Sequence, residues 1–266
     1  MVSNTTGVAS SQVMADALYD ARRIGKSIPP LSATYGLADP VAAYGVQDIN
    51  TGRWVAEGRR IVGRKIGLTS KAVQQQLGVS EPDYGMLWGD LAYKDGDEIS
   101  VKPFLQPRIE AEIAFVMESE IRSPDATLTE LMSAIGYALA SVEIVDSAIA
   151  DWKITLADTI ADNASAGGFA LGTNPRKICD VDLKLCGMLM SRNGVHASLG
   201  VGAACLGHPL VAALWLARKM AEVGRPLEAG DIVLSGALGP MVSVAAGDYF
   251  TVEIQGFSPF GVSFVA

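Results

Sequence analysis

The spacing of hydrophobic positions is helical in the first part of the chain. Residues 11–24 place hydrophobic side chains at helical spacing, and Gly25 follows a basic last turn as a helix C-cap would. Residues 40–61 predict a second helix, so the first sixty residues are expected to form a helical cap or arm. Further helices are predicted at 70–77, 128–139 and 210–223.

An alternating pattern of hydrophobic and polar positions then predicts strands. It is strongest at residues 106–117. After Gly172 most segments are short and strand-like. Two similar units, AGDIVL at 229 and AGDYFTVEI at 246, each place a Gly-Asp turn before a strand, which predicts two consecutive antiparallel strands. The expected class is α+β, without the regular β-α alternation of a doubly wound sheet.

Composition excludes several classes of protein. The 266 residues include 29 Asp+Glu against 21 Lys+Arg, a net charge of −8 that disfavours a nucleic-acid partner. A hydrophobic content of 49% with 19% charged residues supports a sizeable core and excludes disorder. No apolar run approaches the roughly 20 residues that span a bilayer, and the N-terminus does not resemble a secretory signal. We therefore expect no membrane partner and a cytoplasmic location, which three cysteines without a C-x-x-C pair also favour.

Familiar catalytic motifs are incomplete. Gly25-Lys26-Ser27 resembles the end of a phosphate loop, but Asp20 stands where that loop needs glycine. A serine or cysteine nucleophile needs a base, and the chain has two histidines, of which His208 precedes a proline and is interpreted as structural.

Three glutamates carry the strongest chemical signal. In a strand, Glu110 and Glu112 share one face, with their Cα atoms about 7 Å apart, while Ile109 and Ala111 face the other way. Glu143 is a lone acid in a small, apolar run, where a free carboxylate is costly. An edge strand with a solvated acidic face is the alternative. Together the three predict an all-oxygen site for Mg²⁺ or Mn²⁺ rather than Zn²⁺.

Two further segments carry candidate polar groups. Lys65 lies between glycines in an apolar setting, so its ammonium must be paired or shift its pKa downward. Residues 151–165 contain several aspartates and Asn163, which either support the metal site or cap an ordinary helix.

Five long segments resemble one family. They are GRKIGLTSKAVQQQLGVSEPDYGMLW (63–88), QPRIEAEIAFV (106–116), VEIVDSAIADWKITLADTIADNAS (142–165), CLGHPLVAALWLARKM (205–220) and GDIVLSGALGPMV (230–242). They are similar to the hydratase/decarboxylase family of the fumarylacetoacetate-hydrolase-like superfamily, and especially to its 2-hydroxypenta-2,4-dienoate hydratases of meta-cleavage aromatic catabolism. The resemblance covers nearly the whole chain from about residue 12.

The resemblance implies a fold and a set of site residues. The fold would be a mixed β-sheet roll of the fumarylacetoacetase C-terminal type with flanking helices, divided into a helical region (1–61) and a catalytic region (62–266). The implied metal ligands are Glu110, Glu112 and Glu143, and the implied acid/base residues are Lys65 and Asp83. The expected substrate contacts are Leu87, Ser165, Ser235, Gly236 and Ala237, the last three through backbone amides.

The implied reaction is metal-dependent hydration of 2-hydroxypenta-2,4-dienoate to 4-hydroxy-2-oxopentanoate, with segment 70–77 as a lid. Alternatives are a 2-oxo-3-hexenedioate (4-oxalocrotonate) decarboxylase, a hydratase for a longer dienoate, and a non-catalytic partner subunit with a structural ion. The stretch GALGPMV favours the hydratase. A homo-oligomer, and association with a pathway decarboxylase or aldolase, are also expected.

Overall fold

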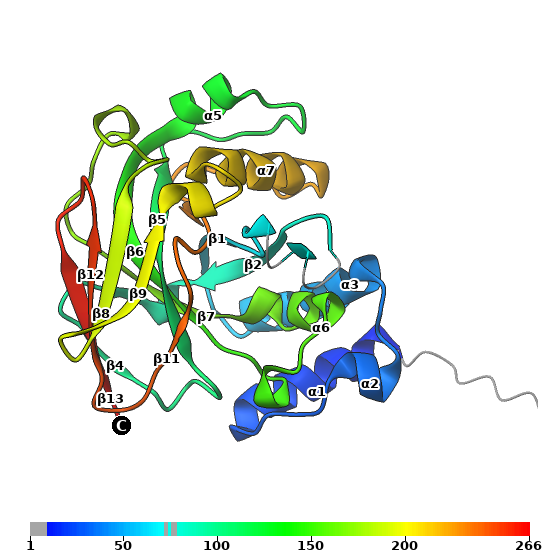
Figure 1. Ribbon diagram of the computed structural model, residues 1–266. Helices are drawn as coiled ribbons and strands as arrows, with labels where there is room; N and C mark the ends of the chain where they lie inside the picture. Colours follow the sequence, from blue (N-terminus) through cyan, green and yellow to red (C-terminus); the bar gives the residue numbers. More distant parts are fainter. Residues whose placement is uncertain (1–9, 72–73, 76–78) are drawn as a thin grey trace, which may run out of the picture.

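The computed structural model describes residues 10–71, 74–75 and 79–266 as two sheets with helices around them (Figure 1). The helices are α1 (Ser11–Ile24), α2 (Leu31–Tyr35), α3 (Pro40–Ala56), α5 (Leu128–Ala134), α6 (Leu156–Ala161) and α7 (Pro209–Glu222). Short 3-10 helices are η1 (Gly89–Leu91), η2 (Ala150–Trp152), η3 (Asn163–Ser165), η4 (Ile178–Asp180) and η5 (Gly202–Ala204). The strands are β1 (Ile61–Gly67), β2 (Asp83–Trp88), β3 (Ala92–Lys94), β4 (Glu98–Ser100), β5 (Arg108–Met117), β6 (Ile135–Val145), β7 (Ala166–Leu171), β8 (Gly187–Arg192), β9 (Val195–Val201), β10 (Ile232–Leu234), β11 (Val242–Ser243), β12 (Tyr249–Ile254) and β13 (Phe260–Val265).

Both sheets are mixed. The larger has the order β2-β1-β10-β5-β6-β7-β3, with β11 beside β5, and the smaller has the order β4-β13-β12-β8-β9. In the larger sheet β1 pairs with β10, and β3 with β7, in parallel; the other pairs are antiparallel. The α+β class expected from the sequence is thereby confirmed.

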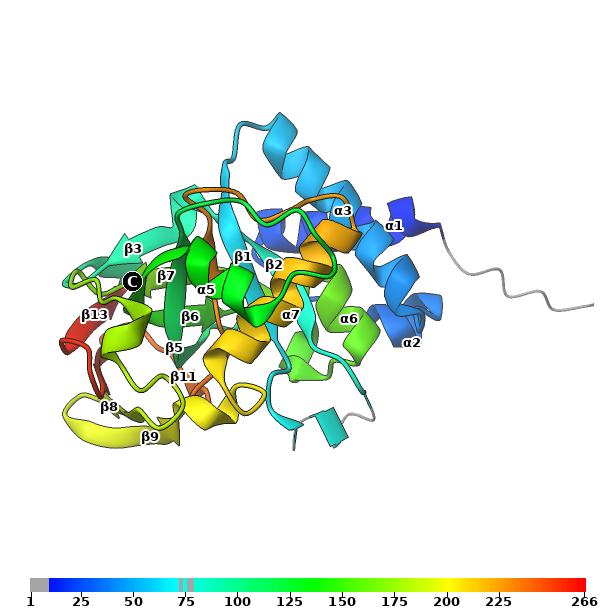
Figure 2. The same ribbon diagram turned by 90° about the horizontal axis from the view of Figure 1, so that it is seen from above.

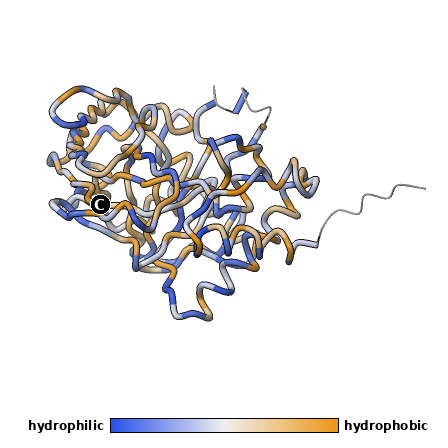
Figure 3. The backbone as a smooth tube through the Cα atoms, turned by 90° about the horizontal axis from the view of Figure 1, so that it is seen from below, coloured by the Kyte–Doolittle hydropathy of each residue, from blue (hydrophilic) through white to orange (hydrophobic). Residues whose placement is uncertain are grey.

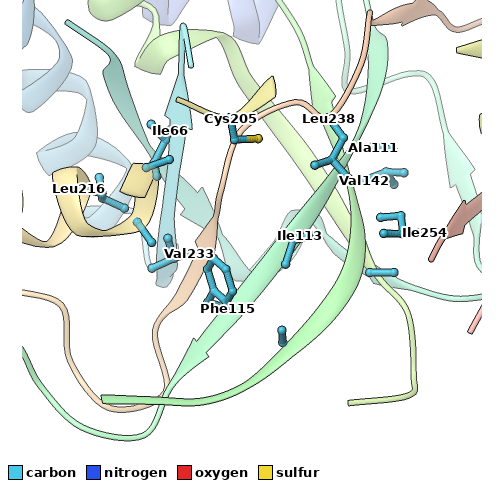
Figure 4. Close-up of a cluster of buried hydrophobic side chains, with 14 of the residues drawn as sticks. Ile66, Ala111, Ile113, Phe115, Val142, Cys205, Leu216, Val233, Leu238 and Ile254 are labelled. Carbon is cyan, nitrogen blue, oxygen red and sulfur yellow. The ribbon is translucent and has the colours of Figure 1, made fainter. Parts of the chain in front are cut away.

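The larger sheet curls around one of its faces, called here the inner face. Leu87 of β2 and Phe169 of β7 come from strands far apart in the sheet order, yet they belong to one buried apolar cluster. The opposite face of β5 carries Ile113 and Phe115, which are fully buried with Val233 and with Leu216 of α7 (Figure 4). The alternation of β5 therefore divides the core from the inner face, as predicted.

The N-terminal helices form a second apolar cluster. Met14 and Leu18 of α1 and Val46 of α3 are buried with Ile160 of α6, and Figure 2 shows these helices together at one side of the larger sheet. The cluster thus combines the first sixty residues with a later helix. The division of the chain at residue 61 stays a prediction.

Helix α1 has the bounds and the Gly25 cap that the sequence predicts, with Gly25 at φ 73°. The helix predicted at 210–223 is confirmed as α7, one residue earlier. The predicted helix 40–61 ends instead at Ala56, because Gly58 turns the chain with φ 94° before β1. The helix predicted at 70–77 extends over positions 72–73 and 76–77, which lie outside the described residues.

Two other expectations are wrong. The helix predicted at 128–139 ends at Ala134, and the chain continues as β6 from Ile135. A strand buried on both faces has a continuous apolar run that periodicity cannot distinguish from a helix, and pairing with β5 decides the outcome. The strands after the two Gly-Asp turns are β10 and β12, which belong to different sheets, because a Gly-Asp turn fixes where a strand starts and not its partner.

Hydrophobic and hydrophilic stretches alternate along the chain in Figure 3. In the parts of the chain that the structure describes, no helix has both the length and the apolar character needed to cross a bilayer.

Arg22 joins the N-terminal helices to the larger sheet. Its guanidinium contacts Asp146, just after β6, at 3.0 Å and Asp162, just after α6, at 2.7 Å. Asp146 also accepts the backbone N–H groups of Leu105 and Gln106, which lead into β5. Both aspartates are almost fully buried, and in the described part of the chain Arg22 is the one cation that pairs with them.

We predict that Arg22→Met destabilises the protein by about 3 kcal/mol, because it leaves two buried carboxylates unpaired. Urea unfolding followed by tryptophan fluorescence measures the loss. Lys26→Met removes the same charge from an exposed position after α1 and is expected to change stability by less than about 0.5 kcal/mol. Equal losses in the two variants would contradict the role of Arg22.

Candidate active site

Three glutamates meet on the inner face. Glu110 of β5 lies directly opposite Glu143 of β6, and Glu112 follows two residues later on the same face of β5. One carboxylate oxygen from each lies within 4.8 Å of the other two. Glu112 and Glu143 are fully buried and Glu110 is half-buried. The structure therefore brings together the three residues predicted as metal ligands.

Several polar atoms at this place have no hydrogen-bond partner among the described residues. They are Glu112 Oε1, Glu143 Oε2, Asp83 Oδ1 and Ser141 Oγ. Burial raises the pKa of Glu112 well above its ordinary value, and the charges of Glu143 and Glu110 raise it further. Burial also raises the pKa of Glu143, to about 8, although Lys65 opposes the shift.

Such a group of carboxylates is costly as anions unless a cation lies between them. Oxygen-only donors match the preference of Mg²⁺ and Mn²⁺, and the three glutamates leave coordination positions for water and substrate. The residues present therefore fit a hard divalent cation.

Lys65 and Asp83 lie on β1 and β2, two strands of the larger sheet that pair with each other, and both residues belong to its inner face. Lys65 of β1 is 3% exposed, and its Nζ lies 3.2 Å from Glu143 Oε1. Burial lowers the pKa of Lys65, but the charges of Glu143 and Asp83 outweigh burial and leave the pKa raised. Burial raises the pKa of Asp83, and Lys65 opposes that shift. Of the two outcomes expected for Lys65, pairing is therefore the one observed.

Gly67 leaves space for the side chains of Asp83 and Lys65. It was missed by the sequence analysis. It lies opposite Asp83 in the pairing of β1 with β2. A Cβ atom at Gly67 would lie 2.0 Å from Asp83 Oδ1 and 3.2 Å from Lys65 Nζ, so any side chain would displace one of them. Its spacing of two residues from Lys65 was the available signal.

The residues predicted as substrate contacts have mixed surroundings. Leu87 lies on the inner face. The Ser165 hydroxyl is 3.2 Å from that of Thr159. The Gly236 amide donates to Glu112 Oε2 at 2.7 Å, and the Ser235 amide donates to the backbone of Ile113. These two amides are therefore used inside the protein, the first of them to hold a candidate ligand.

The polar run before β7 contains a helix-capping group and a contact with β2. Asp158, in the first turn of α6, completes a capping box with the N-cap residue Thr155. The Asn163 side chain instead bonds both the N–H and the C=O of Met86 in β2, and so supports the strand that carries Asp83. His208 accepts from the Leu210 amide as the cap of α7, in keeping with a structural role.

Comparison with known proteins gives one consistent result. The model of the fumarylacetoacetate (FAA) hydrolase C-terminal family matches residues 58–264. The chain is 52% identical to the TodF product hydratase of Pseudomonas putida, over 98% of this chain and 97% of that protein. It is 50% identical to 2-keto-4-pentenoate hydratase 1 of Dechloromonas aromatica, over 95% and 96%.

A solved structure agrees with these relatives. The 4-oxalocrotonate decarboxylase from Pseudomonas putida G7, complexed with magnesium and adipate, superposes with a TM-score of 0.92 at 34% identity, over 96% of this chain and 97% of that one. The family model, the long relatives and this likeness agree with the curled mixed sheet described above. The chain therefore belongs to the fumarylacetoacetate hydrolase family.

Proposed function

We propose that this protein hydrates 2-hydroxypenta-2,4-dienoate, the enol of 2-oxopent-4-enoate, to 4-hydroxy-2-oxopentanoate in meta-cleavage catabolism. The observation that carries the proposal is the set of three glutamates with Lys65 on the inner face. Relatives that share half of the sequence over nearly its full length are named 2-keto-4-pentenoate hydratases, which makes the protein a hydro-lyase.

Glu110, Glu112 and Glu143 would hold Mg²⁺ or Mn²⁺. When bound, that cation supplies a Lewis acid for the C1 carboxylate and the C2 oxygen of the substrate. The Gly236 amide fixes the position of Glu112, and β5 and β6 fix the spacing of the three carboxylates through their register. The protein thus contributes a rigid set of ligands on two paired strands.

Lys65 and Asp83 are proposed to move the protons. Asp83 Oδ1 has no hydrogen-bond partner among the described residues, and Lys65 Nζ lies beside Glu143, so both can reach a substrate that chelates the cation. Transfer of the C2 hydroxyl proton to C5 converts the dienol into a 2-oxo-3-enoate. Water then adds at C4, and C3 takes up a proton.

The inner face also suits the rest of the substrate. Beyond the carboxylates it carries Leu87, Leu139 and Phe169, all buried and apolar. A vinyl tail is compatible with this end, and a charged tail is not. A small-molecule substrate follows from the family. A homo-oligomer, a pathway decarboxylase or aldolase as partner, and a cytoplasmic location stay predictions.

The direct test uses protein stripped of metal and the dienoate, with loss of the dienol absorbance followed before and after Mg²⁺ or Mn²⁺ is added. We expect turnover only with metal, and 4-hydroxy-2-oxopentanoate as the product. Release of CO₂ from the dicarboxylic analogue in preference to hydration would identify a decarboxylase instead. No metal-dependent turnover of any dienoate would support the non-catalytic subunit and defeat the proposal.

We predict that Glu112→Gln lowers the affinity for Mn²⁺ roughly 100-fold or more, measured by calorimetry, because the ligand loses its charge. The melting temperature of the metal-free variant should not fall, since a costly buried carboxylate is removed while an oxygen remains for the Gly236 amide. Glu118→Gln, at an exposed position just after β5, is the matched control and should bind metal normally. Unchanged affinity in Glu112→Gln would exclude it as a ligand.

We predict that Gly67→Ala lowers kcat at least about tenfold, because its Cβ would displace the Asp83 carboxylate. Metal affinity should be retained, since the ligands lie on β5 and β6. Steady-state kinetics and calorimetry measure the two effects. Gly52→Ala, within α3, adds a Cβ that meets nothing within 4 Å, and should leave kcat unchanged. Full activity in Gly67→Ala would show that Asp83 is not needed where it lies.

A further inference from the structure

Arg108 lies at the outer end of the inner face. It is the first residue of β5 and precedes Glu110 by two, so its side chain leaves the strand on the same face as Glu110 and Glu112. Glu112 is fully buried, while Glu110 and Arg108 are half-buried, so the face opens toward Arg108. None of the ion pairs within the described ranges involves Arg108, although four carboxylates lie on the adjoining inner face.

The Arg108 guanidinium is held by an aromatic ring instead. Its central carbon lies 4.4 Å from the centre of the Trp152 ring, and its Nη1 is 3.8 Å from Met241 Sδ. Stacking on a ring face leaves the N–H groups at the edge of the guanidinium free for a planar anion. A weak sulfur contact does not satisfy them.

The turn that presents Trp152 is strained. Asp151 and Trp152 have φ of 59° and 56°, a left-handed conformation that costs free energy for residues with a Cβ. Gln106 holds the turn in place. Its side chain accepts from the Asp151 amide at 2.9 Å and donates to the carbonyls of Ser147 and Ile149.

Gln106 also fixes the position of the Trp152 ring. Its Nε1 donates to the Gln106 carbonyl at 3.2 Å. The ring beneath Arg108 is therefore held by a strained backbone and a set of hydrogen bonds. An arginine without a specific role does not require an aromatic ring held in this way.

The charges on the inner face favour a further cation, the Arg108 guanidinium, for binding an anionic substrate. Glu110, Glu112, Glu143 and Asp83 formally carry four negative charges, and Lys65 with a divalent cation carries three positive ones. An anionic substrate approaching the remaining negative charge is repelled unless another cation is near. Arg108 supplies that charge at the open end of the face.

The inner face is also polar at one end and apolar at the other. Along β5 it runs from Arg108 through Glu110 and Glu112 to Ala114, which is buried with Leu139 and Phe169. The substrate 2-hydroxypenta-2,4-dienoate is also charged at one end and apolar at the other, with a carboxylate at C1 and a vinyl group at C4 and C5. The two match when the carboxylate lies toward Arg108.

We propose that Arg108, stacked on Trp152, binds the C1 carboxylate of the substrate and so sets the direction in which the substrate lies on the inner face. The inference rests on the proposed function, because it takes its substrate from there. Arg108 is a specificity-determining contact in addition to the metal ligands. Trp152 is a positioning residue that acts through Arg108.

The test compares Arg108→Met, Arg108→Lys, Trp152→Leu and Trp152→Phe with the wild type. In Arg108→Met we expect KM for the dienoate to rise roughly 10- to 100-fold, as for loss of a hydrogen-bonded charge, while kcat changes far less. Trp152→Leu should raise KM in the same direction and Trp152→Phe should restore it. Lys102→Met removes one charge from an exposed site and should leave KM unchanged. Affinity for Mn²⁺ should be the same in all variants.

A second measurement does not depend on turnover. Calorimetry with 2-oxopentanoate, a saturated 2-oxo acid that cannot be hydrated, gives the dissociation constant on Mg²⁺-loaded protein. We expect Arg108→Met to weaken binding by a similar factor. Arg108→Lys should weaken it several-fold, because an ammonium cannot form the paired contacts of a guanidinium. If the wild type binds this acid but hydrates no dienoate, the proposed function fails while the role of Arg108 is still decided.

Two results would overturn the inference. One is wild-type affinity for 2-oxopentanoate in both Arg108→Lys and Arg108→Met; should Arg108→Met not fold, Arg108→Lys decides alone. The other is a loss confined to 2-oxohexanedioate, since that would assign Arg108 to a distal carboxylate. A lower kcat with unchanged KM would indicate a merely structural role and would also count against it.

Discussion

The repulsion among the three clustered carboxylates of Glu110, Glu112 and Glu143 is the constraint on which the rest of this structure depends. Glu112 and Glu143 are fully buried, and Glu110 lies opposite Glu143 in the register of β5 and β6. Burial raises the pKa of all three carboxyl groups, because their anionic forms lose the solvation of water. The curled sheet, the Lys65 ammonium and the Gly236 amide all act to hold these charges in place.

The two faces of one strand connect folding to chemistry. Ile113 and Phe115 fix β5 in the core against α7 and β10, and the intervening residues then point toward the inner face. Glycines matter on that face because they give space to reactive side chains: Gly67 accommodates Asp83 and Lys65. A stable core therefore sets the position of groups that are themselves costly to bury.

Sequence patterns predicted the parts that depend on local periodicity. Alternation placed Glu110 and Glu112 on one face, and an isolated acid in an apolar run singled out Glu143. Lys65 was found for the same reason, while Asp83 rested on family resemblance because EPDYG reads as an ordinary turn. The first five residues of β6 were predicted as the end of a helix, because the pairing of β6 with β5 is a long-range contact. Gly67 and Arg108 were not selected: their spacing of two residues from Lys65 and from Glu110 places them on the right face, but their importance lies in neighbours that only the fold brings together.

The most direct measurement of the central claim is anomalous diffraction from crystals of this protein soaked in Mn²⁺. The account predicts one strong peak between Glu110, Glu112 and Glu143, coordinated by carboxylate oxygens from all three. A peak bound by other residues, or none at saturating Mn²⁺, would contradict it.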